Sequence, residues 1–172
     1  MNILNEFKSL FRGTIRHLWR YGVIDDSEDI EEFVMDSTYI FIEMEKGYIK
    51  LKSVDGDSKI EVTIVDKIEY LVDLDEKICR GSINDFVFDY PVYDYYIKKL
   101  GGINVVIKQD KVICEALQLC VCINNTIVQD IFLETGFSGL LIGHISRKNK
   151  WVENFHLVED ESEIKETWFY ED

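Results

Sequence analysis

Residues 39–52 read YIFIEMEKGYIKLK, and this stretch decides the fold class. β-Branched and aromatic residues dominate on both sides of Glu45-Lys46-Gly47, which predicts a hairpin with Gly47 at the position that needs a positive φ. Asp55-Gly56-Asp57 predicts a second turn, and residues 59–64 alternate between apolar and polar side chains as a third strand. The centre of the chain is therefore predicted to be an antiparallel meander.

The second half of the chain continues in the same pattern. Strands are predicted over residues 103–108, 112–123, 126–134, 140–145 and 151–158, with turns at 109–111, 124–125 and 147–150. Residues 68–74 and 86–88 are candidate short strands, and residues 93–100 are ambiguous up to Gly101-Gly102, which is expected to end them. The acidic tail, 159–172, is either a docked last strand or a frayed end.

The first segment is predicted to be an amphipathic helix over residues 2–21. Its apolar residues recur at spacings of three and four, and they are Leu4, Phe7, Leu10, Phe11, Ile15 and Leu18. Its cations form one stripe, and they are Lys8, Arg12, Arg16 and Arg20. Asn2 is positioned to cap the helix and Gly22 to end it. A basic amphipathic helix can lie on a membrane, but residues 1–20 carry +3 and the rest of the chain −17. We therefore expect its apolar face to pack on the protein's own sheet and its four cations to be exposed.

These patterns predict one α+β domain over residues 1–172, in which the helix of 2–21 packs on a mainly antiparallel sheet. The strand-rich part is expected over 38–158. The only proline is Pro91, and no Gly/Ser-rich linker divides the chain.

The chain has 33 acidic and 19 basic residues, a formal charge of −14. This charge repels nucleic-acid phosphates unless a basic patch is segregated, and it suits a basic protein partner; alternatively, it serves only solubility. No stretch approaches a bilayer-spanning length, and residues 1–21 lack a signal-peptide pattern. We expect a cytoplasmic protein with no membrane and no direct nucleic-acid partner.

Motifs for catalysis or metal binding are not found in the sequence. The four cysteines, Cys79, Cys114, Cys120 and Cys122, lack zinc or redox spacing and are expected to be reduced core residues. His17 falls in the predicted helix, and His144 and His156 fall in predicted strands, without a second ligand at metal spacing. Gly136-Phe137-Ser138-Gly139 lacks the spacing of a nucleophile elbow. We predict no catalytic residue, no metal and no cofactor.

Two acidic segments also contain apolar residues. Residues 25–36 hold seven acids around Ile30, Phe33 and Val34, and residues 85–96 interleave aspartates with phenylalanine and tyrosine. Aromatic side chains among acids are typical of a protein-binding patch that meets lysine and arginine, although a solvated face has the same composition. The predicted partner-binding residues are Asp25, Asp26, Glu28, Asp29, Glu31, Glu32, Asp85, Asp89, Tyr90, Tyr93, Asp94 and Tyr96.

The hairpin of residues 39–51, continued through Asp55-Gly56-Asp57, resembles hairpins of bacterial immunity proteins, including those of contact-dependent growth inhibition systems. The resemblance covers residues 38–64. It implies a tight, stoichiometric complex that neutralises a cognate toxin domain, often a basic nuclease, by covering its active-site cleft. It carries over no functional residue.

Two other functions stay open on the sequence. A sheet-edge adaptor or oligomer subunit would need an exposed edge strand and a self-complementary apolar patch. A small hydrolase that uses acidic residues would need a concave pocket with carboxylates of shifted pKa.

Overall fold

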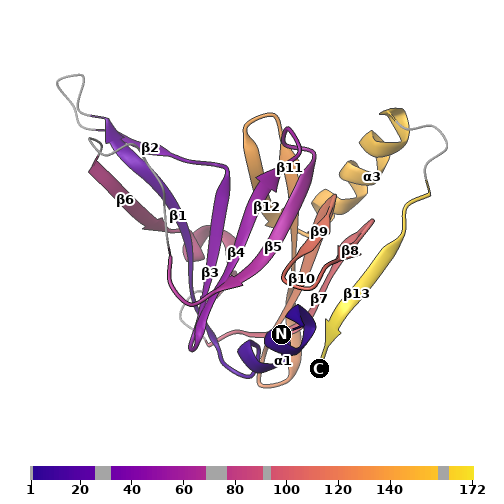
Figure 1. The fold of residues 1–172 in the computed structure, drawn as a ribbon, viewed down its shortest axis with the longest axis horizontal. Coiled ribbons are helices and arrows are strands. Elements are labelled where there is room, and N and C mark those ends of the chain that lie inside the picture. Colours follow the sequence, from indigo (N-terminus) through magenta and orange to yellow (C-terminus); the bar gives the residue numbers. More distant parts are fainter. Residues whose placement is uncertain (1, 26–31, 69–76, 91–93, 159–162) are drawn as a thin grey trace.

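The computed structural model describes residues 2–25, 32–68, 77–90, 94–158 and 163–172. In these ranges the chain forms two antiparallel sheets that face each other, together with three helices (Figure 1). The predicted α+β class, with a helix at the N-terminus and a mainly antiparallel sheet structure, is confirmed.

The first sheet has eight strands. Seven of them follow the order β2-β1-β3-β4-β5-β9-β8, and the eighth, β6, pairs with β1 on the edge opposite β2 and β3. Its strands are β1 (Ile15–Asp25), β2 (Glu32–Met35), β3 (Tyr39–Met44), β4 (Gly47–Val54), β5 (Lys59–Val65), β6 (Lys77–Ser82), β8 (Val106–Ile107) and β9 (Val112–Cys114). The predicted hairpin is confirmed, because Met44 pairs with Gly47 across the turn and Gly47 has a φ of 145°.

The second sheet has five strands in the order β12-β11-β10-β7-β13. They are β7 (Tyr96–Ile103), β10 (Ala116–Ile123), β11 (Thr126–Gly136), β12 (Gly139–His144) and β13 (Glu166–Glu171). One bent hairpin joins the two sheets: β7 leads into β8, and β9 leads into β10. At the bend, Asn104 Nδ2 donates to Glu115 Oε2 at 2.8 Å and the Glu115 N–H donates to the Ile103 carbonyl at 3.0 Å. The backbone thus changes sheet while its polar groups stay paired.

The core lies between the two sheets. The fully buried inward side chains include Leu18, Ile40, Ile42, Ile49, Leu51, Ile60, Val62 and Val112 from the first sheet, and Leu117, Leu119, Val121, Ile131, Leu133 and Leu140 from the second. They alternate with outward residues along each strand, as the two-residue period of a strand requires. Each such side chain stabilises the fold by about 1.5–3 kcal/mol through burial.

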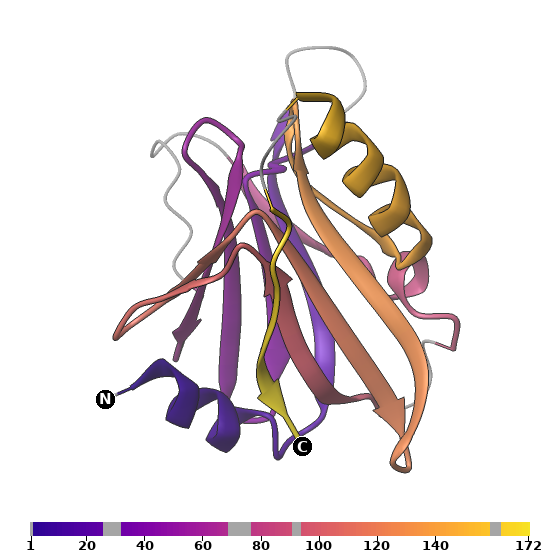
Figure 2. The ribbon, with the colours of Figure 1, turned by 90° about the vertical axis from the view of Figure 1, so that its right-hand side faces the viewer.

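The helices cover an end and an outer face of this sandwich. Helix α1 (Ile3–Leu10) lies across one end of the strands, where Phe11 packs edge-on to Tyr170 at 4.5 Å between ring centroids (Figure 2). Helix α3 (Ser146–Val158) packs on the outer face of the second sheet, with Trp151 near Phe132. Helix α2 (Asn84–Val87) is a single short turn after β6.

The predicted helix over 2–21 is wrong beyond Leu10, because Ile15–Asp25 is strand β1. The Asn2 cap is confirmed, since its Oδ1 accepts from the Leu4 N–H at 3.0 Å. The physical reason for the error is a β-bulge between Ile15 and His17. The extra residue places the two core-facing residues Ile15 and Leu18 three positions apart, which imitates helical spacing. Five of the six apolar residues of the stripe are buried as predicted, and the sixth, Leu4, is half-buried.

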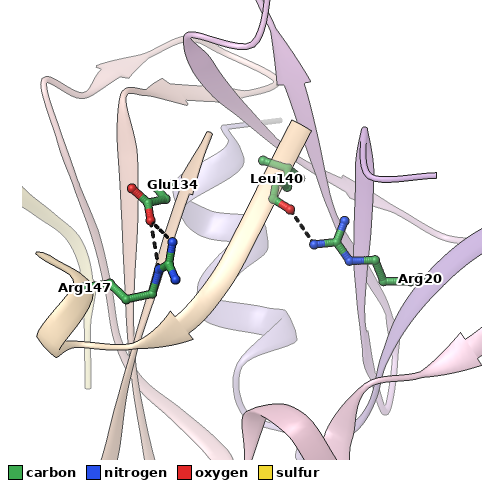
Figure 3. A network of polar contacts seen from close by, with 4 residues as sticks. All are labelled: Arg20, Glu134, Leu140 and Arg147. Atoms are coloured by element: carbon green, nitrogen blue, oxygen red, sulfur yellow. Dashed lines mark hydrogen bonds and ion pairs between the residues drawn. The ribbon is translucent and has the colours of Figure 1, made fainter. Parts of the chain in front are cut away.

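Arg20 is a second correction, because it is buried while Lys8, Arg12 and Arg16 are exposed as predicted. Its guanidinium reaches from β1 to the other sheet and donates to the Leu140 carbonyl at 2.5 Å (Figure 3). It also donates to the Ser37 carbonyl at 3.2 Å. The Leu140 N–H donates to the same Ser37 carbonyl at 2.7 Å. Burial lowers the pKa of Arg20, and nearby Asp36 opposes that shift. Arg20 therefore fixes the position of β12 against β1.

Four further predictions about elements are wrong. Residues 147–150, predicted as a turn, and residues 151–158, predicted as a strand, belong to α3, in which Trp151 and Phe155 stack at 5.1 Å with helical i,i+4 spacing. Residues 86–88 belong to α2 and its end. Gly101 and Gly102 do not end a strand but lie inside β7. A Cβ on Gly101 would lie 2.6 Å from the Trp168 ring, so this glycine serves close packing.

Two segments that the sequence left open also have a defined structure. The ambiguous residues 93–100 contain the start of β7, and the tail docks as β13. Most of the candidate strand at 68–74 lies outside the described residues.

Candidate partner-binding surface

The segment after β6 is fixed to β1 at its start. The Ile83 N–H donates to the Leu18 carbonyl at 2.9 Å, and Asn84 Oδ1 accepts from the Leu18 N–H at 2.7 Å. Asn84 Nδ2 also donates to the Arg16 carbonyl at 3.2 Å. The bulged part of β1 thereby finds its hydrogen-bond partners in this segment, and the segment starts at a defined place.

Buried side chains hold the rest of the segment. Phe88 and Tyr95 are both buried and stack with their ring centroids 4.3 Å apart, and Val87 is buried beside them. The Tyr90 N–H donates to the Tyr95 hydroxyl at 3.2 Å. The buried side chain of Gln129 on β11 also holds this backbone through two hydrogen bonds. Its Oε1 accepts from the Asp89 N–H at 3.2 Å, and its Nε2 donates to the Val87 carbonyl.

The side chains between these anchors point outward. Phe86 is 90% exposed, Tyr90 59% and Tyr96 40%. Asp85, Asp89 and Asp94 are exposed as well. We call residues 84–90 and 94–96 the acidic loop. It presents three carboxylates and three aromatic rings on a backbone held by buried groups.

Most of the predicted residues in this part of the chain therefore lie on one short segment. Tyr93 lies outside the described residues. Sequence reasoning missed Phe86, because a phenylalanine is expected to be buried and residues 86–88 were predicted to form a strand. The only sequence signal for its exposure is its position next to Asp85.

The other predicted segment lies elsewhere. Asp26, Glu28, Asp29 and Glu31 are outside the described residues, whereas Asp25 and Glu32 are exposed and face each other across the β1–β2 pair. Asp25 is seven residues beyond Leu18, which is about 23 Å along a strand. The structure therefore does not bring Asp25 and Glu32 together with the acidic loop, and the predicted single surface is divided into two.

Strand β2 differs from the acidic loop in its burial. All four of its residues are exposed, including Phe33, Val34 and Met35 at 43–48%. It forms the end of the strand order in the first sheet. An edge strand with exposed apolar side chains is a template for pairing with another strand.

Three of the four cysteines are core residues of β9 and β10, and Cys79 lies on β6 of the first sheet. Cys114, Cys120 and Cys122 are buried and Cys79 is half-buried, and all four are free thiols. Burial raises the pKa of Cys114, and burial together with neighbouring Asp130 raises the pKa of Cys120 to about 12. Thiols of such pKa stay protonated at neutral pH and are poor nucleophiles and metal ligands.

The histidines lie on the surface. His144 is exposed at the end of β12, with Nδ1 3.1 Å from Ser146 Oγ, and His156 lies in α3 and not in a strand as predicted. His17 lies on β1 and not in a helix, with its ring 4.6 Å from the Trp19 ring. Within the described residues, no three His, Cys, Asp or Glu side chains are grouped so as to hold a metal ion.

A groove of about 570 Å³ lies between α3 and the β4–β5 turn, and it bears on the alternative of a hydrolase that uses acidic residues. Two carboxylates line it, Glu115 and Glu134. Glu134 accepts two hydrogen bonds from Arg147, with Nε at 2.9 Å (Figure 3). Glu115 accepts a hydrogen bond from Asn104. Both carboxylates therefore have structural partners.

None of the helices in the described parts of the chain is long and apolar enough to cross a membrane. Comparison of the chain with protein-family models, with curated proteins and with solved structures finds no match in any of the three.

Proposed function

We propose that this protein acts by binding a basic protein partner through the acidic loop. The observation that carries the proposal is the contrast within one segment: Phe86, Tyr90 and three aspartates are exposed, while Val87, Phe88 and Tyr95 are buried beneath them. An exposed aromatic ring on a fixed backbone binds with little loss of conformational entropy. Aromatic anchors surrounded by polar groups are typical of residues that dominate protein–protein affinity.

The charge of the loop specifies the partner's chemistry. Three exposed carboxylates on a chain of charge −14 attract a surface rich in lysine and arginine. Such a surface lines the phosphate-binding cleft of a nuclease. Following the resemblance to immunity proteins, we propose a cognate nuclease toxin domain as the partner, neutralised when the loop covers its cleft.

The experiment is a binding and inhibition assay with the toxin domain encoded beside this protein. We expect a one-to-one complex at low salt, loss of nuclease activity in the complex, and weakening of both by Phe86→Ala combined with Asp89→Lys. The matched control is Phe137→Ala combined with Asp110→Lys, which changes an exposed phenylalanine and an exposed acid elsewhere. No complex at low salt, or equal weakening by the control, contradicts the proposal, and turnover of a small substrate by the isolated protein contradicts a binding-only role.

A second candidate function rests on β2. Its exposed Phe33, Val34 and Met35 at the end of the sheet suit a sheet-edge adaptor that pairs with a strand of another chain. Val34→Lys would place a charge on this edge and prevent such pairing. Sedimentation of the wild-type protein as a monomer at high concentration, unchanged by Val34→Lys, contradicts self-pairing through this edge.

A further inference from the structure

On the outer face of the first sheet, basic side chains lie over a group of aromatic rings, although the chain as a whole is strongly acidic. Cross-strand pairing places Trp19 beside Phe41 and Phe41 beside Lys50, and it places Tyr39 beside Lys52 and Tyr21 beside Arg80. We call Trp19, Tyr39, Phe41, Lys50, Lys52 and Arg80 the cationic face. It runs across four neighbouring strands, β6, β1, β3 and β4.

Each cation of this face lies over an aromatic ring. Lys50 Nζ is 4.9 Å from the Tyr39 ring centroid and 6.0 Å from that of Phe41, and Lys52 Nζ is 5.8 Å from that of Tyr39. Arg80 Cζ is 4.2 Å from the Trp19 ring. These distances allow cation–π attraction, which holds the charges in place. Phe41 is fully buried on this outer face, beneath its neighbours.

The three cations of this face have no ion-pair partner within the part of the chain that the structure describes. Among the described residues, Lys50, Lys52 and Arg80 form no ion pair, whereas Lys59 and Lys111 at the margin pair with Asp55 and Glu61. Two acids lie on this face beside these residues: Glu43 accepts the Trp19 Nε1–H at 2.6 Å, and Glu61, opposite Lys52, is paired with Lys111. The cationic face is therefore a local positive surface on a protein of charge −14.

We propose that the cationic face binds an acidic segment of a second protein. Three strand spacings of about 4.8 Å separate Arg80 from the two lysines, which is about 14 Å. Acidic residues four positions apart in an extended peptide are about 13 Å apart, so two carboxylates would meet both ends of the face. An apolar side chain between them would contact the half-buried Trp19 and Tyr39 and the aliphatic stems of the lysines.

The geometry favours a carboxylate-bearing peptide over single-stranded nucleic acid. Nucleic-acid platforms stack bases on open aromatic faces. Here Arg80 covers Trp19, the lysines cover Tyr39, and Phe41 is buried, so the groups presented outward are the cations themselves. The remaining surface charge would also repel a phosphate at every nucleotide.

The test measures fluorescence anisotropy of a short labelled peptide with two glutamates four positions apart and a leucine midway between them. We expect binding at low ionic strength that falls steeply with salt. Lys50→Met combined with Lys52→Met keeps the aliphatic stems over the rings and should weaken binding about tenfold, as should Arg80→Met. The matched control is Lys8→Met combined with Arg12→Met, which removes the same charge from exposed positions on and beside α1.

Each outcome bears on the proposal. Selective weakening by the variants of the cationic face supports it, provided that thermal unfolding shows all variants folded. Equal binding of a peptide with glutamines for glutamates, equal weakening by the control, or no binding at low salt overturns it. Tighter binding of a thymidine oligonucleotide than of the peptide overturns it in favour of nucleic acid. The result does not depend on the acidic loop, whose variants should bind the peptide like the wild type.

Discussion

The acidic loop and strand β2 both present acidic and aromatic side chains, but only the acidic loop also contains buried side chains. Both place an acid directly before an exposed phenylalanine, Asp85 before Phe86 in the loop and Glu32 before Phe33 in β2. The loop alternates exposed residues with buried Val87, Phe88 and Tyr95, whereas every residue of β2 is exposed. The comparison teaches that an acidic, aromatic run is a candidate rigid binding surface only where neighbouring side chains anchor it in the core.

The largest expected effect is the loss of an anchor. Phe88→Ala should lower the free energy of unfolding by about 3–5 kcal/mol, because it leaves a cavity beside Tyr95. Phe33→Ala in β2 should cost under about 1 kcal/mol, since this ring is 43% exposed. Urea unfolding of both variants measures the difference. Equal costs would show that the loop and β2 are equally anchored.

The next effect concerns partner binding. Phe86→Ala should weaken the complex with the cognate partner by about 2–4 kcal/mol while leaving stability within about 0.5 kcal/mol, because the ring is 90% exposed. Calorimetric titration and urea unfolding measure the two quantities. Phe33→Ala is the matched variant, and a larger loss of affinity at Phe33 would move the binding surface to β2.

Loss of the two Gln129 hydrogen bonds to the acidic loop should have an intermediate effect on stability and on partner binding. Gln129→Leu leaves the Asp89 N–H and the Val87 carbonyl without their partner and should cost about 1–3 kcal/mol of stability. It should also weaken partner binding, since the loop loses its fixed backbone. Gln109→Leu, at an exposed position, is the control. Amide hydrogen exchange in residues 84–90 that is unchanged by Gln129→Leu would contradict this role of Gln129.

Charge should affect the rate of association more than the affinity. Neutralising Asp85, Asp89 and Asp94 together with asparagine should slow association about tenfold at low salt, with little effect at high salt. Neutralising Asp25 and Glu32 should have a smaller effect, because they lie about 23 Å along β1 from the start of the loop. Stopped-flow association across a salt series tests this ranking. A greater effect of the Asp25 and Glu32 pair would reverse it.

At neutral pH the smallest effect concerns the reactivity of the four cysteine thiols. Cys79, half-buried on β6, should react with a thiol reagent in the native protein, whereas Cys114, Cys120 and Cys122 should react only after unfolding. The folded state keeps Cys120 protonated up to a pKa of about 12, and the unfolded thiol ionises near pH 8.5. Stability should therefore fall as pH rises from about 8.5 towards 12, and Cys120→Ala should make this fall shallower. An unchanged slope would remove Cys120 as its cause.

The sequence by itself predicted the local features of this protein. The hairpin of residues 39–52 follows from β-branched residues around Gly47, and the turn at Asn124-Asn125 joins β10 and β11 as expected, with both asparagines at positive φ. The aromatic and acidic character of residues 85–96 was also evident. These features depend on residues close in sequence, so local rules suffice to predict them.

Only the tertiary structure decided the rest, because those features depend on which distant segment lies opposite. A bulge gave β1 an apolar spacing like that of a helix, and residues 151–158, which have strand-like composition, lie in α3 with Trp151 packed on Phe132. Arg20, four residues after Arg16, is buried because carbonyls of Ser37 and Leu140 lie within its reach. The same is true of the surfaces: the groups outside the acidic loop that hold it come from β1 and β11, and the cations of the cationic face come from β4 and β6. Charge and apolar content are properties of the sequence, but exposure on a fixed backbone is a property of the packed chain.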